Sequence, residues 1–211
     1  LTLAGVIMTT NAQAENYFEN DIRAFEAADR ANPPPTNAVL FIGSSTIRLW
    51  DTAQADFPDI VLFNRGFGGA TCPDVLHFMD RIVIPYRPRT IVFYDGDNDL
   101  AHGRSTAQVV RDIREFVARV HDKLPATKII LLFIKPSPQR WSLADKARAV
   151  NAEIRAIADA DPRVECVDVF TPMLGKDGLP RPELYVEDGL HMSPAAYRIW
   201  RDILKPYLEW G

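Results

Sequence analysis

The sequence predicts an α/β protein: a three-layer α/β/α sandwich around a five-stranded parallel sheet. Two observations support this prediction. Five apolar runs of strand length alternate along the chain with segments whose apolar residues recur at helical spacing. These runs are also nearly continuous in hydrophobicity, which is typical of parallel strands covered by helices on both faces. Repeated βα units with right-handed crossovers then produce three layers.

The first expected element is an amphipathic helix. Tyr17, Phe18, Ile22 and Phe25 recur at helical spacing. The three prolines at residues 33–35 end this helix, because proline lacks a backbone N–H and disfavours helix in the residue before it.

Strands and helices then alternate to the end of the chain. Ser193 followed by Pro194 is a favoured start for the final helix. The expected strands are residues 38–42, 60–63, 90–94, 128–134 and 164–169. The expected helices are residues 74–84, 106–124, 143–159 and 194–209.

Composition and charge narrow the class of protein. A chain of 211 residues suits one domain, since cores stop growing above roughly 250 residues. Its 24 basic and 28 acidic side chains give a net charge of −4, which argues against nucleic acid or an anionic membrane as the main partner. We expect no transmembrane segment, because no apolar run in the chain reaches the roughly 18 residues that a membrane span needs. Cys72 and Cys166 lie far apart in the sequence and do not have the spacing of metal ligands. The sequence does not decide whether they form a disulfide.

The N-terminal residues differ from the rest of the chain. A short apolar run is followed by Ala12-Gln13-Ala14, which is typical of the end of a secretory signal peptide. We therefore interpret residues 1–14 as a signal-peptide remnant and residues 15–211 as the folded domain. The protein is then exported, to the periplasm or the medium. The alternative is an unstructured tail on a cytoplasmic protein.

Chemically active residues follow the expected strands. In a sheet of this kind, ligands bind at the carboxyl ends of the strands. The segments found there carry hydroxyls, glycines, an amide, carboxylates and one imidazole, which are the parts of an acyl-transfer site. They are residues 43–46, 64–71, 95–99, 135–138 and 188–193.

Four of these segments resemble the sequence blocks of the SGNH (GDSL-type) hydrolase superfamily. The blocks are Gly-Asp-Ser after the first strand, a glycine after the second, Gly-x-Asn-Asp after the third and Asp-x-x-His near the C-terminus. Here they read Gly43-Ser44-Ser45, Gly69, Gly-Asp-Asn-Asp at residues 96–99 and Asp-Gly-Leu-His at residues 188–191. The segments at residues 66–69 and 135–138 resemble esterases related to platelet-activating-factor acetylhydrolase. The resemblance implies the flavodoxin-like fold of that superfamily.

The resemblance also implies a role for each matching residue. Ser45 aligns with the nucleophile, His191 with the general base and Asp188 with the acid that orients the base. The oxyanion hole combines the backbone N–H groups of Ser45 and Gly69 with the side-chain amide of Asn98. This chemistry uses no cofactor and no metal ion.

Two features depart from the pattern or complicate it. The aspartate of the first block is Ser44 here, so two adjacent hydroxyls compete for the role of nucleophile, and the motif position favours Ser45. Three carboxylates also surround Asn98 in sequence, where negative charge would oppose an oxyanion. We expect Asp95, Asp97 and Asp99 to point into turns or to pair with Arg48, Arg65 or Arg104.

The sequence leaves two other functions open. Asp95 and Asp97 directly after an apolar strand resemble the Asp-x-Asp pair of metal-dependent phosphatases, although Asn98 follows where that motif has Thr or Val. The second alternative is a non-catalytic carbohydrate- or partner-binding module on the same fold.

We predict a serine ester hydrolase that cleaves small or short-chain acyl esters through an acyl-enzyme. The substrate is a small-molecule or carbohydrate ester. Trp141 is a candidate wall of its pocket, and the alternative is a role in the core or as surface cover. The sequence does not identify the natural ester or the oligomeric state.

Overall fold

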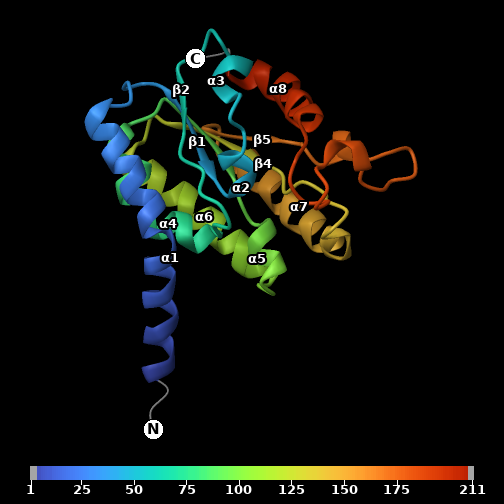
Figure 1. The fold of residues 1–211 in the computed structure, drawn as a ribbon, viewed down its shortest axis with the longest axis horizontal. Coiled ribbons are helices and arrows are strands. Elements are labelled where there is room, and N and C mark those ends of the chain that lie inside the picture. Colours follow the sequence, from blue (N-terminus) through green and yellow to red (C-terminus); the bar gives the residue numbers. More distant parts are fainter. Residues whose placement is uncertain (1–3, 209–211) are drawn as a thin grey trace.

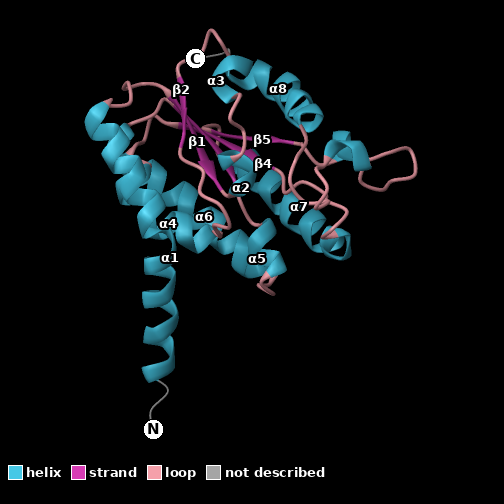
Figure 2. Ribbon diagram, in the orientation of Figure 1, coloured by secondary structure: helices cyan, strands magenta, loops and turns pink. Residues whose placement is uncertain are grey.

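The predicted sandwich is confirmed by the computed structural model, which describes residues 4–208, and the side chains of residues 17–208 (Figures 1 and 2). The strands are β1 (Val39–Gly43), β2 (Leu62–Asn64), β3 (Thr90–Tyr94), β4 (Lys128–Leu132) and β5 (Val164–Val167). They lie in the order β2-β1-β3-β4-β5, and every neighbouring pair is parallel.

Helices cover both faces of this sheet (Figure 2). On one face α1 (Ala4–Ala31), α4 (Cys72–Ile82), α6 (Thr106–Lys123) and α7 (Ala144–Ala160) pack side by side in that order. The other face carries α2 (Ser45–Arg48), α3 (Ala53–Asp56) and α8 (Pro194–Leu208). Trp50, between α2 and α3, packs against Tyr197 and Trp200 of α8. Among the described residues, no helix has both the length and the apolar character to cross a bilayer.

The burial of the central strands explains why their sequences are continuously apolar. Every residue of β1 and β3 is buried, because helices lie on both sides of these central strands. Gly43 and Tyr94 pair at the carboxyl ends of β1 and β3, so the segments that follow the two strands emerge next to each other.

Two strands end earlier than expected. We expected β4 to reach residue 134, but it ends at Leu132. Ile134 is buried like a strand residue, but its N–H and carbonyl bond the side chain of Asn151 on α7 instead of a neighbouring strand. Similarly β5 ends at Val167, before the expected residue 169, and Asp168 then accepts hydrogen bonds from the backbone of Phe170 and Thr171.

Short helices were missed by the sequence prediction. α2, α3 and α5 (Asp97–Ala101) have four or five residues, too few to show a helical period. Four short 3₁₀ turns were also not predicted: Ile84–Tyr86, Trp141–Leu143, Thr171–Met173 and Pro182–Leu184.

The N-terminal helix is longer than expected. α1 begins at Ala4, and its first part extends beyond the rest of the fold (Figure 1). It therefore runs without a break through the boundary proposed at residues 14 and 15, while the side chains of residues 1–14 lie outside the described part. The signal-peptide interpretation stays a prediction. Cys72 and Cys166 are free thiols in the structure.

Candidate active site

A tight turn carries Ser45 to the carboxyl edge of the sheet. Gly43 ends β1 with φ 145°, and a Cβ added there would lie 1.8 Å from the carbonyl oxygen of Tyr94. Only glycine fits so close to a neighbouring strand. The chain then enters α2 at Ser45, which is partly exposed.

His191 lies between Ser45 and Asp188. Its Nε2 is 3.1 Å from Ser45 Oγ, and its Nδ1 is 2.5 Å from Asp188 Oδ2. Because an ionised carboxylate can only accept hydrogen bonds, it fixes the ring proton on Nδ1 and leaves Nε2 to accept from the Ser45 hydroxyl. The structure thus brings together the three residues that the sequence singled out as nucleophile, base and orienting acid.

Asp188 is held in a turn that also keeps it ionised. Its Oδ1 accepts from the N–H of Leu190 at 2.8 Å and from the N–H of His191 at 2.9 Å. Desolvation raises the pKa of Asp188, but the hydrogen bonds from the His191 ring and from these two N–H groups outweigh it and hold the pKa at about 2. The imidazole therefore faces a negative charge across the neutral pH range.

The segment after β4 anchors this turn. Lys135 Nζ donates to the carbonyl of Leu190 at 2.8 Å, and the N–H of Gln139 donates to the carbonyl of Gly189 at 3.1 Å. Lys135 is only 4% exposed, and burial lowers the pKa of its ammonium group. The sequence singled out the loop at residues 135–138, but it gave no indication that Lys135 reaches the turn of His191.

The proposed oxyanion donors Ser45, Gly69 and Asn98 each have an N–H hydrogen that is not used in a hydrogen bond within the described part of the protein. The backbone N–H groups of Ser45 and Gly69 have no acceptor among the described residues. Gly69 has φ 86°, and the position of its missing Cβ faces open space. Asn98 Nδ2 donates one hydrogen to the carbonyl of Ala70 at 2.9 Å, which places this amide beside the Gly69 turn. The second hydrogen of Nδ2 is left for a ligand.

The two adjacent hydroxyls of Ser44 and Ser45 differ in their surroundings. His191 contacts Ser45, whereas Ser44 is 1% exposed and its Oγ has no hydrogen-bond partner among the described residues. A buried hydroxyl cannot reach a substrate carbonyl without a change in the turn.

The three carboxylates near Asn98 are paired or turned inward. Asp99 lies 3.2 Å from Arg104, as we expected, and Asp95 accepts from the N–H of Gly96. Asp97 pairs with Arg140, which was not among the expected partners. Their negative charge is therefore partly balanced beside the oxyanion donors. Of the other two candidates for this pairing, Arg65 pairs with Asp29 of α1 instead, and Arg48 lies against Gly68.

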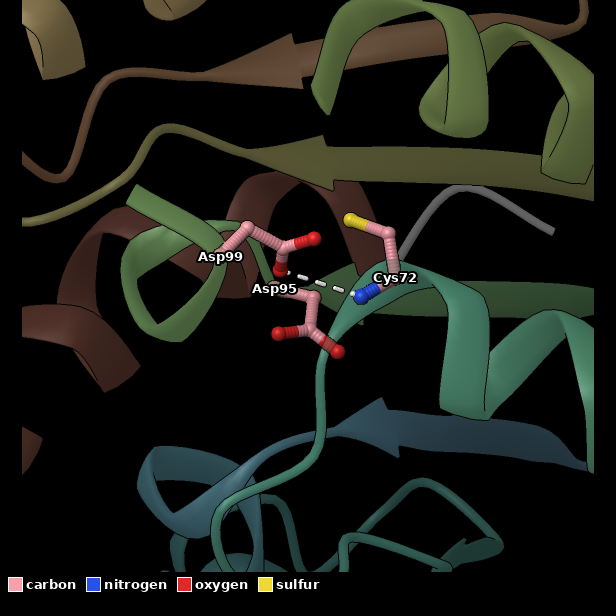
Figure 3. A group of neighbouring side chains, drawn as sticks. All are labelled: Cys72, Asp95 and Asp99. Atoms are coloured by element: carbon pink, nitrogen blue, oxygen red, sulfur yellow. Dashed lines mark hydrogen bonds between the residues drawn. The ribbon is translucent and has the colours of Figure 1, made fainter. Parts of the chain in front are cut away.

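One group of side chains could hold a metal ion in the described part of the chain. Donor atoms of Cys72, Asp95 and Asp99 lie within 4.8 Å of one another (Figure 3). All three residues are buried, and the N–H of Cys72 donates to Asp99 Oδ2 at 3.1 Å, which ties the start of α4 to α5.

Burial affects the protonation of this group. Burial raises the pKa of the Cys72 thiol well above its usual value, so this thiol is protonated in the metal-free protein. Burial, reinforced by the charge of Asp99, also raises the pKa of Asp95 well above its usual range. Asp95 is 1% exposed, so no phosphorus atom of a substrate reaches it, contrary to what the phosphatase alternative requires.

A small recess lies beside the Asn98 side of the site. Asp97, Arg140 and Trp141 line it together with Leu100 and Ile134. Trp141 is partly exposed and carries the guanidinium of Arg148 over its ring at 5.3 Å. Trp141 therefore lines this recess and also packs against the hydrophobic core.

The arrangement as a whole can transfer a proton from a serine hydroxyl to an imidazole and stabilise negative charge nearby. The chain is also similar in sequence to known acylhydrolases. The model of the GDSL-like Lipase/Acylhydrolase family matches residues 21–199. Platelet-activating factor acetylhydrolase IB subunit alpha1 from Bos taurus is 28% identical over 165 residues, which cover 75% of this chain and 69% of the relative.

Solved structures share the fold. A protein from Streptococcus pneumonia superposes with a TM-score of 0.82 at 24% identity, covering 98% of this chain and 100% of that one. A GDSL-like lipase from Bacteroides thetaiotaomicron superposes with a TM-score of 0.77 at 24% identity, covering 89% of this chain and 97% of that one.

Proposed function

This chain belongs to the GDSL-like lipase/acylhydrolase family and is a carboxylic ester hydrolase, and we propose that it cleaves small or short-chain acyl esters through a Ser45-His191-Asp188 triad. The observation that carries the proposal is the bridge formed by His191, with Ser45 Oγ 3.1 Å from one ring nitrogen and Asp188 2.5 Å from the other.

In the first half of the reaction, Ser45 Oγ attacks the carbonyl carbon of the ester. Nε2 of His191 takes the hydroxyl proton as the new C–O bond forms. The carbonyl π electrons move onto the oxygen and produce a tetrahedral oxyanion. When the carbonyl re-forms, the bond to the alcohol breaks, and the alcohol leaves with the proton held on Nε2.

The second half repeats these steps with water. His191 takes a proton from water, the resulting hydroxide attacks the acyl-enzyme, and Ser45 recovers its proton as the acid leaves. Asp188 stabilises the imidazolium in both halves without accepting its proton, since a pKa of about 2 keeps this carboxyl ionised.

Three donors stabilise the oxyanion in this scheme. They are the free N–H groups of Ser45 and Gly69 and the second hydrogen of Asn98 Nδ2. Loss of one such donor typically costs about 3 kcal/mol of transition-state stabilisation.

The exposure of the triad supports a small, soluble ester. The side chains of His191 and Asp188 are 31% and 44% exposed, so a substrate reaches them without the opening of a lid. The name of the curated relatives specifies an acetyl group as the group removed, which supports a short acyl chain here.

A series of p-nitrophenyl esters from acetate to laurate, with acetylated xylan alongside, tests the substrate class. We expect kcat/KM to be highest for the shortest chains. A preference for laurate would contradict the small-ester proposal, and absence of turnover on every ester would favour the binding-module alternative. The Ser45→Ala variant serves as the blank for each substrate.

A further inference from the structure

Resting on the proposed function, a further role follows for a residue that lies outside the sequence blocks. We propose that Arg140 is a positioning residue, which holds the side-chain amide of Asn98 in the one orientation that directs an N–H toward the oxyanion. Arg140 lies after β4, just ahead of the 3₁₀ turn Trp141–Leu143, and its side chain is 21% exposed.

Arg140 contacts both acceptors on this side of the site. Its Nη1 lies 3.0 Å from Asn98 Oδ1 and 3.0 Å from Asp97 Oδ2. The opposite end of the Asn98 amide is also fixed, because Nδ2 donates to the carbonyl of Ala70 at 2.9 Å. The amide is thus held at its oxygen and at its nitrogen by partners of opposite kind.

These two partners allow only one orientation of the amide. If the amide rotated by half a turn, its NH₂ group would face the guanidinium, and its oxygen would face the Ala70 carbonyl. Both hydrogen bonds would become donor–donor or acceptor–acceptor contacts. Asn98 is 6% exposed, so water cannot replace the lost bonds. Without Arg140, only the hydrogen bond from Asn98 Nδ2 to the Ala70 carbonyl would favour the orientation in which an N–H points toward the oxyanion.

The guanidinium also polarises the amide. A positive group at Oδ1 withdraws electron density from the amide and makes the remaining Nδ2–H a stronger donor. Asp97 balances the positive charge of Arg140, so the effect on the oxyanion passes mainly through Asn98 and less through the field of a free cation.

The segment that carries Arg140, residues 135–140, also contacts the turn that carries His191. Gln139 and Lys135 bond the carbonyls of Gly189 and Leu190, in the turn that carries His191. Residues 135–140 therefore hold the oxyanion amide at one end and the base at the other, although the two lie far apart in sequence.

A double-mutant cycle between Arg140 and Asn98 tests this role. We expect Arg140→Met to lower kcat by roughly ten- to a hundredfold with little change in KM, a part of the loss expected for a whole oxyanion donor. In an Asn98→Ala background the same substitution should have almost no further effect on kcat, because the group it positions is gone.

A second variant, Arg140→Lys, separates the loss of positioning from a loss of stability in the methionine variant, because lysine keeps the positive charge beside Asp97. A lysine has a point charge on a flexible stem and does not reproduce the guanidinium geometry, so kcat should still fall while the melting temperature stays near that of the parent. Arg163→Met, which removes an exposed arginine just before β5, at the edge of the sheet opposite the site, is the matched control and should leave kcat unchanged.

Two results would overturn the proposal. One is a parental kcat in both Arg140 variants, and the other is an equal fall in kcat with and without Asn98, which would mean that Arg140 acts independently of that amide. Failure of the proposed function gives a different result, because Ser45→Ala would then remain active whatever the cycle shows.

Discussion

The buried carboxyl pair Asp95 and Asp99 should make the stability of the protein fall as the pH rises toward neutrality. Burial raises the pKa of Asp99 from 3.8 to about 6, although Cys72 N–H and Arg104 act against it. In the unfolded chain the group titrates near 3.8. Between these two values the native state binds more protons than the unfolded state, so the stabilisation is complete below pH 3.8 and is lost as the pH rises through about 6.

The size of the effect follows from the shift. A rise of about two pKa units corresponds to about 3 kcal/mol of stability lost between pH 4 and pH 7. Asn at this position resembles the protonated acid and can still accept from the N–H of Cys72. We therefore expect Asp99→Asn to match the parent at pH 4 and to exceed it by about 3 kcal/mol at pH 7, or roughly 6–12 °C in melting temperature.

Urea unfolding of parent and variant at half-unit steps from pH 4 to 8 measures this difference. Carboxylates remote from the pair titrate equally in both proteins and cancel in the difference, whereas Asp95 responds to the charge of Asp99, so its contribution is part of the difference that is measured. Asp145→Asn, at a side chain that is 98% exposed, is the matched control and should give parallel curves. Parallel curves for Asp99→Asn as well would refute the reasoning, because they would show that the carboxyl titrates alike in the folded and unfolded states.

Three further predictions concern the site. Asp188→Asn should lower kcat by about 10⁴-fold with little change in KM, because the amide no longer fixes the ring proton on Nδ1; a loss below tenfold in steady-state assays would contradict the orienting role. Lys135→Met should leave the Leu190 carbonyl without its 2.8 Å donor. It should cost about 1–3 kcal/mol in urea unfolding and lower kcat, and an unchanged kcat would show that the turn of His191 needs no such anchor. Dialysis against EDTA should leave kcat/KM unchanged, because the triad itself supplies nucleophile and base; inactivation that Mg²⁺ or Zn²⁺ reverses would favour a metal-dependent reaction.

The sequence predicted the architecture because hydrophobic burial determines it directly. Strands covered on both faces must be apolar throughout, and β1 and β3 are buried at every position. Boundaries were less predictable, since Ile134 and Val169 stay buried after the hydrogen-bond ladder has ended. The short helices α2 and α5 carry Ser45 and Asn98, but one turn of helix has no period to detect.

The site was predictable to the extent that chain position determines it. Residues at the ends of parallel strands meet at one edge, so the order of the segments indicated that they converge. The resemblance to the SGNH superfamily then singled out Ser45, Asn98 and His191 within them. The contacts of Arg140 and Lys135 were not predicted, because they depend on the direction of long side chains. Arg140 reaches Asn98 over 42 positions, and Lys135 reaches Leu190 over 55. Contacts between residues so far apart in the sequence produce no periodicity or motif that a single sequence could show.

Covalent labelling with a fluorophosphonate, followed by mass spectrometry of the peptides, tests the central claim most directly. Its phosphorus is attacked by an activated serine and then mimics the tetrahedral intermediate. We predict one adduct per chain, located on Ser45, still formed in Ser44→Ala and absent in Ser45→Ala. An adduct on Ser44, or no adduct on the folded and ester-cleaving protein, would contradict the account.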